Sequence, residues 1–441
     1  VRPQGLEDSR PGRDREVVPT LTATANSTTD EPGVIPLDSS DPEVDAGLTV
    51  RWGVTPDLTA NFTINPDFSQ IEADVAQLDV NNRFAIFYPE KRPFFLEGAD
   101  YYSTPIEAVF TRTIASPDFG VKVTGKRGKH TFGAIAAQDE VTNLLFPELY
   151  GSELETFEQS NTVFVGRYSR GFDDASSIGV ITTLREGDDY HNYVGGIDAR
   201  WRLNDQHSIE LNHLESTTQY PEDIALEFEQ PLDEFDGRAT TVEYEYDSRN
   251  WSGEIEFVDF SSGFRADTGK VDKVGGYGYE TRIGRVFHGS SEDWWTRVRA
   301  NLHYDVLYEE DGRLAERIKR FRVGGGGPLQ SWAQVNLFDM EMRHDDVLYD
   351  LKRMSLYTEF VPRAGLDVML LTSFGDQIDY ANSRPGSSTY YEVMVNWNAT
   401  RNLFMRLRGT TSNLETTDGE EVFDASLIDA RFTWQFNVRS F

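Results

Sequence analysis

The sequence predicts an all-β protein, a transmembrane antiparallel β-barrel of the outer-membrane type with about 20 strands (about 18–22) and a lumenal or periplasmic insert. Three observations support this prediction. Apolar and polar residues alternate with a period of two over most of the chain after residue 46. The alternating segments run to roughly 10–15 residues, which is long for a globular strand. The connections between them are alternately short and long.

The alternation is clear near the end of the sequence, in the segment 428–438. Ile428 and Phe432 have one parity there, whereas Asp429 and Arg431 have the other. A period of two indicates a strand with one apolar and one polar face. A barrel strand needs about 9–11 residues to cross a membrane, so these lengths favour a membrane barrel. The alternative is a soluble all-β protein, either two sandwiches or a propeller, although no blade-length repeat is visible.

The connections fall into two groups that interleave along the chain. This asymmetry is typical of outer-membrane barrels, which have short periplasmic turns and long outer loops. The short connections include 204–206, 247–250 and 289–293, and the long ones include 142–160, 218–237 and 261–273. The long connections carry many of the acidic residues.

Composition excludes several other classes of protein. The chain has 74 acidic and 42 basic residues and a net charge of -32, which argues against a broad basic surface for nucleic acid. It has no cysteine, which excludes disulfides, thiolate metal sites and cysteine nucleophiles. No segment approaches the about 18 consecutive apolar residues of a transmembrane helix. Aromatic residues make up 12%, more than disordered chains contain.

Two domains are predicted from these patterns. Residues 1–45 are rich in Pro, Thr, Ser and Asp, and we expect them to form an extended periplasmic tail or linker. Residues 46–441 form the barrel. Within it, residues 65–105 interrupt the alternation, and long irregular segments in compact folds are often functional. We expect them to form a plug or constriction that leaves from the side with short turns.

Two blocks of this insert carry a resemblance to a known family. The first is Asn65-Pro-Asp-Phe followed by Gln70, Glu72 and Asp74, and the second runs from Pro89 to Gly98 as PEKRPFFLEG. Over residues 46–441 the chain resembles a domain-of-unknown-function family. In that family the domain follows a module similar to family-9 carbohydrate-binding domains in Gram-negative outer-membrane proteins. The resemblance implies a barrel fold and an outer-membrane location, and no activity.

The second block places charged residues around a Pro-Phe-Phe wedge. The candidate gate or plug residues are Glu90, Lys91, Arg92, Phe94, Phe95 and Glu97. One interpretation is a gate whose charges contact a solute, and the other is a plug fixed by ion pairs and two buried rings. In the first block, Asp67, Glu72 and Asp74 offer oxygen ligands for Ca²⁺, although their spacing matches no EF-hand loop.

If the apolar faces meet lipid, the polar faces line the lumen. They contain an acidic stripe of Glu243, Glu245, Asp247, Glu254 and Glu256, and a basic stripe of Arg297, Arg299, Arg320, Arg322 and Arg353. Opposed stripes would create a transverse field, and arrays of charge set pore selectivity. Alternatively, the charges pair with one another and hold the barrel or plug in shape.

The predicted function is a passive or gated pore for a small solute, or an envelope scaffold. The alternatives are a barrel enzyme acting on envelope lipid or glycan, and a surface-binding protein that uses its acidic outer loops. The sequence contains neither His-Glu-x-x-His nor Gly-x-Ser-x-Gly, so no catalytic residue is predicted. The expected partners are outer-membrane lipid and lipopolysaccharide, an unidentified small solute and a periplasmic or surface protein, but not nucleic acid. No cofactor is predicted other than Ca²⁺ at the acidic loops.

Overall fold

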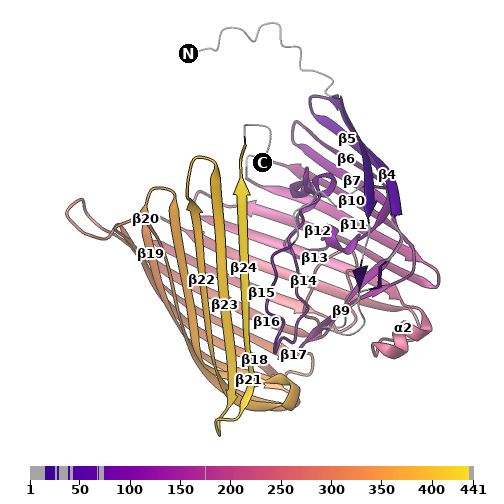
Figure 1. The fold of residues 1–441 in the computed structure, drawn as a ribbon. Helices are drawn as coiled ribbons and strands as arrows, with labels where there is room; N and C mark the ends of the chain where they lie inside the picture. Colours follow the sequence, from indigo (N-terminus) through magenta and orange to yellow (C-terminus); the bar gives the residue numbers. More distant parts are fainter. Residues whose placement is uncertain are drawn as a thin grey trace.

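A single curved antiparallel sheet of 20 strands dominates the computed structural model (Figure 1). The structure describes residues 15–24, 27–28, 38–39, 43–66, 68, 74–173 and 175–436. The predicted all-β class, the antiparallel pairing and the strand number are confirmed. Among the helices of these residues, none has the length and apolar character needed to cross a membrane.

The elements follow the predicted alternation closely. The strands of the large sheet are β1 (Arg15–Thr24), β4 (Glu43–Thr55), β5 (Leu58–Ile64), β6 (Pro117–Arg127), β7 (His130–Asp139), β10 (Asn161–Gly171), β11 (Ser177–Gly187), β12 (Tyr190–Arg202), β13 (His207–Gln219), β14 (Phe235–Asp247), β15 (Trp251–Phe260), β16 (Gly276–His288), β17 (Arg297–Glu309), β18 (Leu314–Gly327), β19 (Ser331–His344), β20 (Val347–Arg363), β21 (Leu366–Asp379), β22 (Arg384–Asn398), β23 (Leu403–Thr416) and β24 (Glu421–Trp434). The smaller elements are the pairs β2 (Ser27–Thr28) with β3 (Asp38–Ser39) and β8 (Thr142–Pro147) with β9 (Ser152–Phe157), the helices α1 (Pro93–Leu96) and α2 (Glu222–Glu227), and the 3-10 turns η1 (Ala99–Tyr102), η2 (Thr111–Thr113) and η3 (Tyr380–Asn382).

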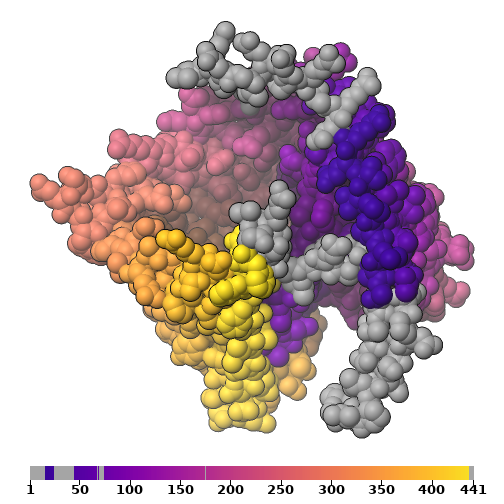
Figure 2. All heavy atoms as spheres, turned by 45° about the horizontal axis from the view of Figure 1, so that its top comes forward, coloured from indigo at the N-terminus to yellow at the C-terminus, as the bar shows by residue number. Residues whose placement is uncertain are grey.

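The two faces of the sheet differ in polarity. Large apolar side chains such as Ile283, Phe321 and Ile428 are exposed on the outer face, as they are on a barrel surrounded by lipid. The inner face carries polar groups, and some of these, including Lys122 and Arg185, are completely buried. Figure 2 shows the inner face as a hollow between the pink and orange strands and the indigo and purple strands. The sheet therefore has a lipid-type outer surface and a polar interior.

The two ends of the sheet also differ. One end carries the tight turns, for example 56–57, 128–129 and 364–365. The opposite end, called here the long-loop end, carries the segment 65–116, the β8–β9 hairpin, the loop with α2 and the loop 261–275. The insert thus leaves from the long-loop end, in contrast to our expectation.

The reason for this difference is an additional strand. Arg15–Thr24 forms β1, which pairs with β4 over its whole length, from Arg15 opposite Trp52 to Thr24 opposite Glu43. Part of the predicted tail 1–45 therefore belongs to the sheet. One added strand reverses the end from which every later connection leaves. Val17 and Leu21, which share a parity, are exposed on its surface, so the period-two signal is present in β1 too.

Candidate functional site

The insert begins and ends at neighbouring points of the sheet. Ile64 at the end of β5 pairs with Phe119 in β6. One residue further on, the amide of Asn65 donates to the carbonyl of Asp118 over 2.6 Å. Residues 65–116 are therefore an insertion between two strands that pair as an ordinary hairpin. This insertion is longer than the predicted insert, 65–105.

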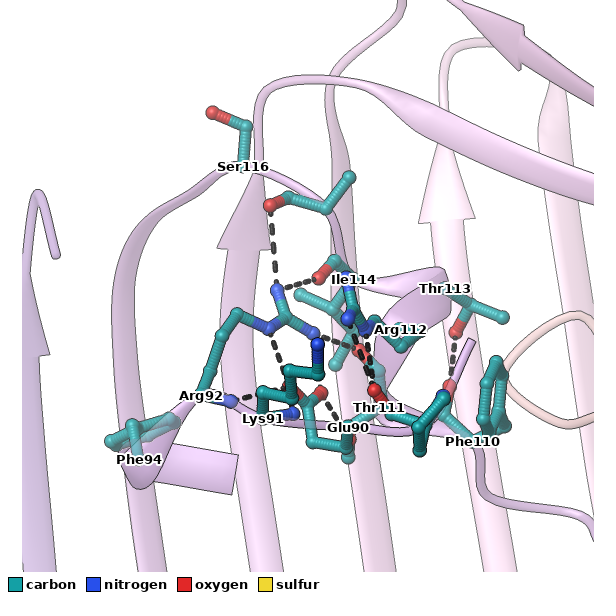
Figure 3. A network of polar contacts seen from close by, with 12 residues as sticks. Glu90, Lys91, Arg92, Phe94, Phe110, Thr111, Arg112, Thr113, Ile114 and Ser116 are labelled. Carbon is teal, nitrogen blue, oxygen red and sulfur yellow. Dashed lines mark hydrogen bonds and ion pairs between the residues drawn. The ribbon is translucent and has the colours of Figure 1, made fainter. Parts of the chain in front are cut away.

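Arg92 is the centre of the insert (Figure 3). Its guanidinium donates to both carboxylate oxygens of Glu90, with Nε 2.9 Å from Oε1 and Nη2 2.6 Å from Oε2. The same group donates to the carbonyls of Thr111 at 2.7 Å and Ile114 at 2.5 Å. It lies 4.3 Å from the ring centroid of Phe95. Arg92 is only 5% exposed, and these contacts join the block PEKRPFFLEG to the turn η2.

Glu90 is held in its ionised form by this arrangement. Burial by itself raises its pKa, but the hydrogen bonds and the positive charge of Arg92, with a hydrogen bond from Thr111, lower the pKa below the ordinary value. The Thr111 hydroxyl donates to Oε2 over 2.7 Å. A charge pair of this kind stabilises only while both partners are present, because either one alone is an uncompensated buried charge.

The wedge Phe94-Phe95 packs against the inner face of the sheet. Both rings are buried in one cluster with the apolar residues Tyr102, Ile114, Ile135, Ala137, Val163 and Val165. Lys122 of β6 is 0% exposed and donates to the backbone carbonyls of Phe94 and Glu97. Those carbonyls lie at the end of the short helix α1, so the lysine satisfies acceptors that the helix leaves open.

Glu97 links the insert to two further strands. Its carboxylate accepts from Nε of Arg51 in β4 over 2.6 Å and from Nδ2 of Asn61 in β5 over 3.2 Å. Both side chains come from the inner face of the wall. Glu97 is therefore part of the anchoring of α1, together with Lys122.

Asp74 is the one described member of the predicted Ca²⁺ site. It accepts from Nη2 of Arg112 through both oxygens at 2.8 Å, and Nζ of Lys91 lies 3.1 Å from Oδ1. Two cations thus already neutralise this carboxylate. The other two members, Asp67 and Glu72, lie outside the described residues.

The insert reaches the opposite wall of the interior. Arg83 donates to Glu316 of β18 over 2.7 Å, and Lys273 donates to the same carboxylate over 2.9 Å. Asn81 donates to the carbonyl of Ile378 over 2.8 Å and accepts from the amide of Tyr380 over 3.0 Å. The chain between residues 81 and 98 therefore spans the interior from β18 and β21 to β6.

A third anchor holds residues 104–111. The amide of Ile106 donates to Asn212 of β13 over 2.9 Å, and the amide of Phe110 donates to the carbonyl of Thr268 over 2.7 Å. The loop 261–275 thus folds inward against the insert. Its Asp267 is completely buried and accepts from two tyrosine hydroxyls, Tyr190 at 2.7 Å and Tyr220 at 3.1 Å. Burial raises the pKa of Asp267, although these hydrogen bonds act in the opposite direction.

The predicted acidic stripe is part of a larger arrangement on the inner face. Glu243 lies opposite Glu256 in the register of β14 and β15, and Glu245 lies opposite Glu254. The first of these rows continues across five strands as Glu210, Glu243, Glu256, Glu280 and Asp305. Like charges directly opposite each other are destabilising. Asp247 lies at the short-turn end, opposite Ser252.

One arginine that sequence reasoning missed compensates part of this charge. Arg282 of β16 lies opposite Glu254 and donates to it over 2.6 Å and to Glu280 over 3.0 Å. Carboxylate oxygens of Glu243, Glu254 and Glu256 lie within 4.8 Å of one another, which is close enough to share a cation. Because Arg282 already pairs with Glu254, the negative charge of this cluster is partly neutralised. The predicted Ca²⁺ at the acidic outer loops stays a prediction.

The predicted basic stripe separates into three places. Arg299, Arg320 and Arg322 line one cavity on β17 and β18. Arg297 lies at the short-turn end, with its guanidinium 5.6 Å from the ring centroid of Trp332. Arg353 of β20 lies elsewhere and donates to Ser388 over 2.8 Å and Ser373 over 3.1 Å.

Comparisons with known proteins agree with this architecture. The fold is that of an outer-membrane β-barrel. The family model of a domain of unknown function, DUF5916, matches residues 16–140, which confirms the predicted resemblance over that part of the chain. The match contains both the sheet strands β1 to β7 and the insert. No curated protein matches the sequence.

Solved structures are similar to this chain at very low sequence identity. The ferric enterobactin receptor PfeA of Pseudomonas aeruginosa matches with a TM-score of 0.51 and 7% identity, covering 96% of this chain and 73% of the receptor. The FrpB iron transporter of Neisseria meningitidis matches with a TM-score of 0.46 and 10% identity, over 96% and 75%. OccK10 of P. aeruginosa matches with a TM-score of 0.42 and 11% identity, over 72% and 92%.

Proposed function

We propose that the protein is a gated outer-membrane pore for a small solute, in which residues 65–116 act as the plug. The observation that carries the proposal is the path of the insert. It is fixed to β4, β5 and β6 through Glu97 and Lys122, and to β18 through Arg83. A segment that is attached to opposite walls of a polar interior obstructs that interior.

The polar interior supports passage rather than a purely structural role. Buried charged groups on the inner face are costly unless they are paired, and a scaffold needs no unpaired guanidinium groups in its interior. Absence of conductance in both the intact protein and a folded variant without the insert would indicate an envelope scaffold. A barrel enzyme and a surface-binding protein have no specific observation in their favour among the described residues.

The register of β5 and β6 suggests a clean removal of the plug. Since Asn65 and Asp118 face each other, an Asn-Gly pair can replace residues 66–117 and close a two-residue hairpin. Conductance of both proteins is then measured in planar bilayers, after circular dichroism has verified that each is folded. We expect small or intermittent currents from the intact chain and large steady currents from the hairpin variant.

Two results would contradict the proposal. Equal steady conductance of both proteins would show that the insert is not a plug. Silence of both folded proteins would overturn the pore and favour the scaffold.

A further inference from the structure

A cavity on the inner face of β14 to β18 is rich in arginine. It has a volume of about 320 Å³. Arg299, Arg320 and Arg322 line it, together with Asn301 and His303. These residues come from two neighbouring strands, in which Asn301 lies opposite Arg322 and His303 opposite Arg320. The lining also includes Arg282 and the carboxylates of Glu245 and Glu254, and Arg282 pairs with Glu254.

The three guanidinium groups form no ion pair with a carboxylate among the residues that the structure describes. The neighbouring Arg282, by contrast, pairs with both Glu254 and Glu280. The chain has 74 acidic residues against 42 basic ones, so a shortage of carboxylates does not explain the difference. Positive charge that is partly removed from water and forms no ion pair is costly unless an anion compensates it.

The hydrogen bonds in the cavity also leave donors in excess. Nη2 of Arg320 lies 2.8 Å from Nδ1 of His303, and an arginine nitrogen can only donate. Nδ1 is therefore the acceptor, and in the neutral ring Nε2 carries the hydrogen. His303 is 9% exposed, and both its Nε2 and the Nε of Arg320 are buried without an acceptor in the described part of the chain.

The remaining two arginines also have free donors. Arg322 uses its Nε for a hydrogen bond to Oδ1 of Asn336 over 2.9 Å, and its terminal nitrogens have no acceptor among the described residues. Arg299 is exposed and makes no hydrogen bond to them. Guanidinium forks bind carboxylate and phosphate oxygens in a bidentate manner.

We propose that this cavity binds a small oxyanion, a solute that carries a carboxylate or phosphate group. The inference rests on the proposed pore and names the class of solute that the interior selects. The adjoining row of Glu243, Glu256 and Glu280 repels anions from the neighbouring wall. An anion in the interior is therefore attracted to the arginines and excluded beside them, which is selectivity by both attraction and repulsion.

Isothermal titration of the full chain in detergent with citrate, and separately with inorganic phosphate, tests the proposal. We expect saturable binding of at least one of the two at low ionic strength, weakened by added salt. Arg320→Gln and Arg322→Gln should each weaken it about tenfold or more, since each removes charge-assisted hydrogen bonds. Citrate binding without phosphate binding identifies a carboxylate site, and the reverse result identifies a phosphate site.

Two further variants control for folding and for total charge. Arg299→Gln changes an exposed side chain that makes no hydrogen bond among the described residues, so it keeps the fold and should still weaken binding. Arg406→Gln removes a positive charge from β23, where Arg406 donates to Asn396 over 3.1 Å, in the way that Arg322 donates to Asn336. We expect binding to the Arg406→Gln variant to be unchanged.

Three results would overturn the anion site. The first is that neither anion binds. The second is that the wild type and all three cavity variants bind equally well. The third is that the Arg406→Gln variant loses as much affinity as the cavity variants. Titration needs no open channel, so failure of the two proposals can be told apart. Binding without conductance would keep the site and remove the pore, whereas conductance without binding would remove the site alone.

Discussion

The cations in and beneath the insert and the cations on β17 and β18 lie inside the same sheet, yet their surroundings differ. Arg92 and Lys122 are almost completely buried, and each has carboxylate or carbonyl acceptors from the insert. Arg299 and Arg322 are more accessible and form no ion pair with a carboxylate among the described residues. Burial and partners thus separate a cation that holds the structure together from one that is available to a solute.

The acceptors explain why this separation arises. The insert brings backbone carbonyls and the carboxylates of Glu90 and Glu97 against the wall formed by β4 to β7. At the wall formed by β17 and β18, the ion pair with the described part of the insert is that of Arg83, a further cation, with Glu316. The two regions therefore make opposite predictions for the removal of a positive charge.

The largest effect is expected for Arg92→Ala. It leaves the buried carboxylate of Glu90 without its partner, and breaking a buried pair costs about 3–5 kcal/mol. We expect the amides of residues 74–116 to lose protection by about this free energy in native-state hydrogen exchange, while the strands stay protected.

The double variant Glu90→Gln with Arg92→Met provides the control. Because it removes both charges together, it should cost clearly less than Arg92→Ala. Equal exchange in the single variant and the wild type would show that this pair does not anchor the plug.

A change in the wall rather than in the insert should have an intermediate effect. Gly133 of β7 lies beneath the ring of Tyr102, and a Cβ at Gly133 would lie 2.8 Å from a ring carbon. Gly133→Val therefore forces the buried tyrosine away at a cost of about 1–3 kcal/mol. We expect larger conductance and faster exchange around η1.

Gly195→Val is the matched control for this variant. A Cβ at Gly195 meets nothing within 4 Å, so the same substitution on β12 should leave both measurements unchanged. If Gly133→Val behaves like Gly195→Val, the contact of Tyr102 with the wall does not hold the insert.

The sequence predicts the strands well, because a period of two is a local property that survives any arrangement of the sheet. It also indicates that PEKRPFFLEG forms an ordered unit, since charges and aromatic rings are adjacent in the chain. Sequence reasoning misses the strand β1, although Val17 and Leu21 have the same parity there. Pro19, which lacks an amide hydrogen, and the surrounding Thr residues give the segment the composition of a linker.

The division of the arginines could not be predicted, because it depends on register and on contacts between distant residues. Arg282 pairs with Glu254 across β15 and β16, whereas Arg322 faces Asn301 and Asn336. The pairing of Arg83 with Glu316 joins residues that are far apart in sequence. The inward parity of Lys122 was a usable signal, but its acceptors in α1 are visible only in three dimensions.

The smallest effect is expected for a change of pH. The pKa of Glu90 is lowered from its ordinary value of 4.5, because the hydrogen bonds and charge of Arg92 outweigh the opposing influence of burial. A lowered carboxyl pKa contributes stability above the ordinary value, and this contribution is lost as the pH falls through the lowered pKa. Since the two causes oppose each other, the insert should keep its protection near neutrality and through mild acid, and lose it only in strong acid.

Hydrogen exchange at a series of pH values measures this, and Glu90→Gln should abolish that pH dependence. Loss of protection on acidification that is already complete above the ordinary value would contradict the assignment to Glu90. A carboxyl with a raised pKa, such as Asp267, acts in the opposite sense, because its contribution to stability is lost as the pH rises.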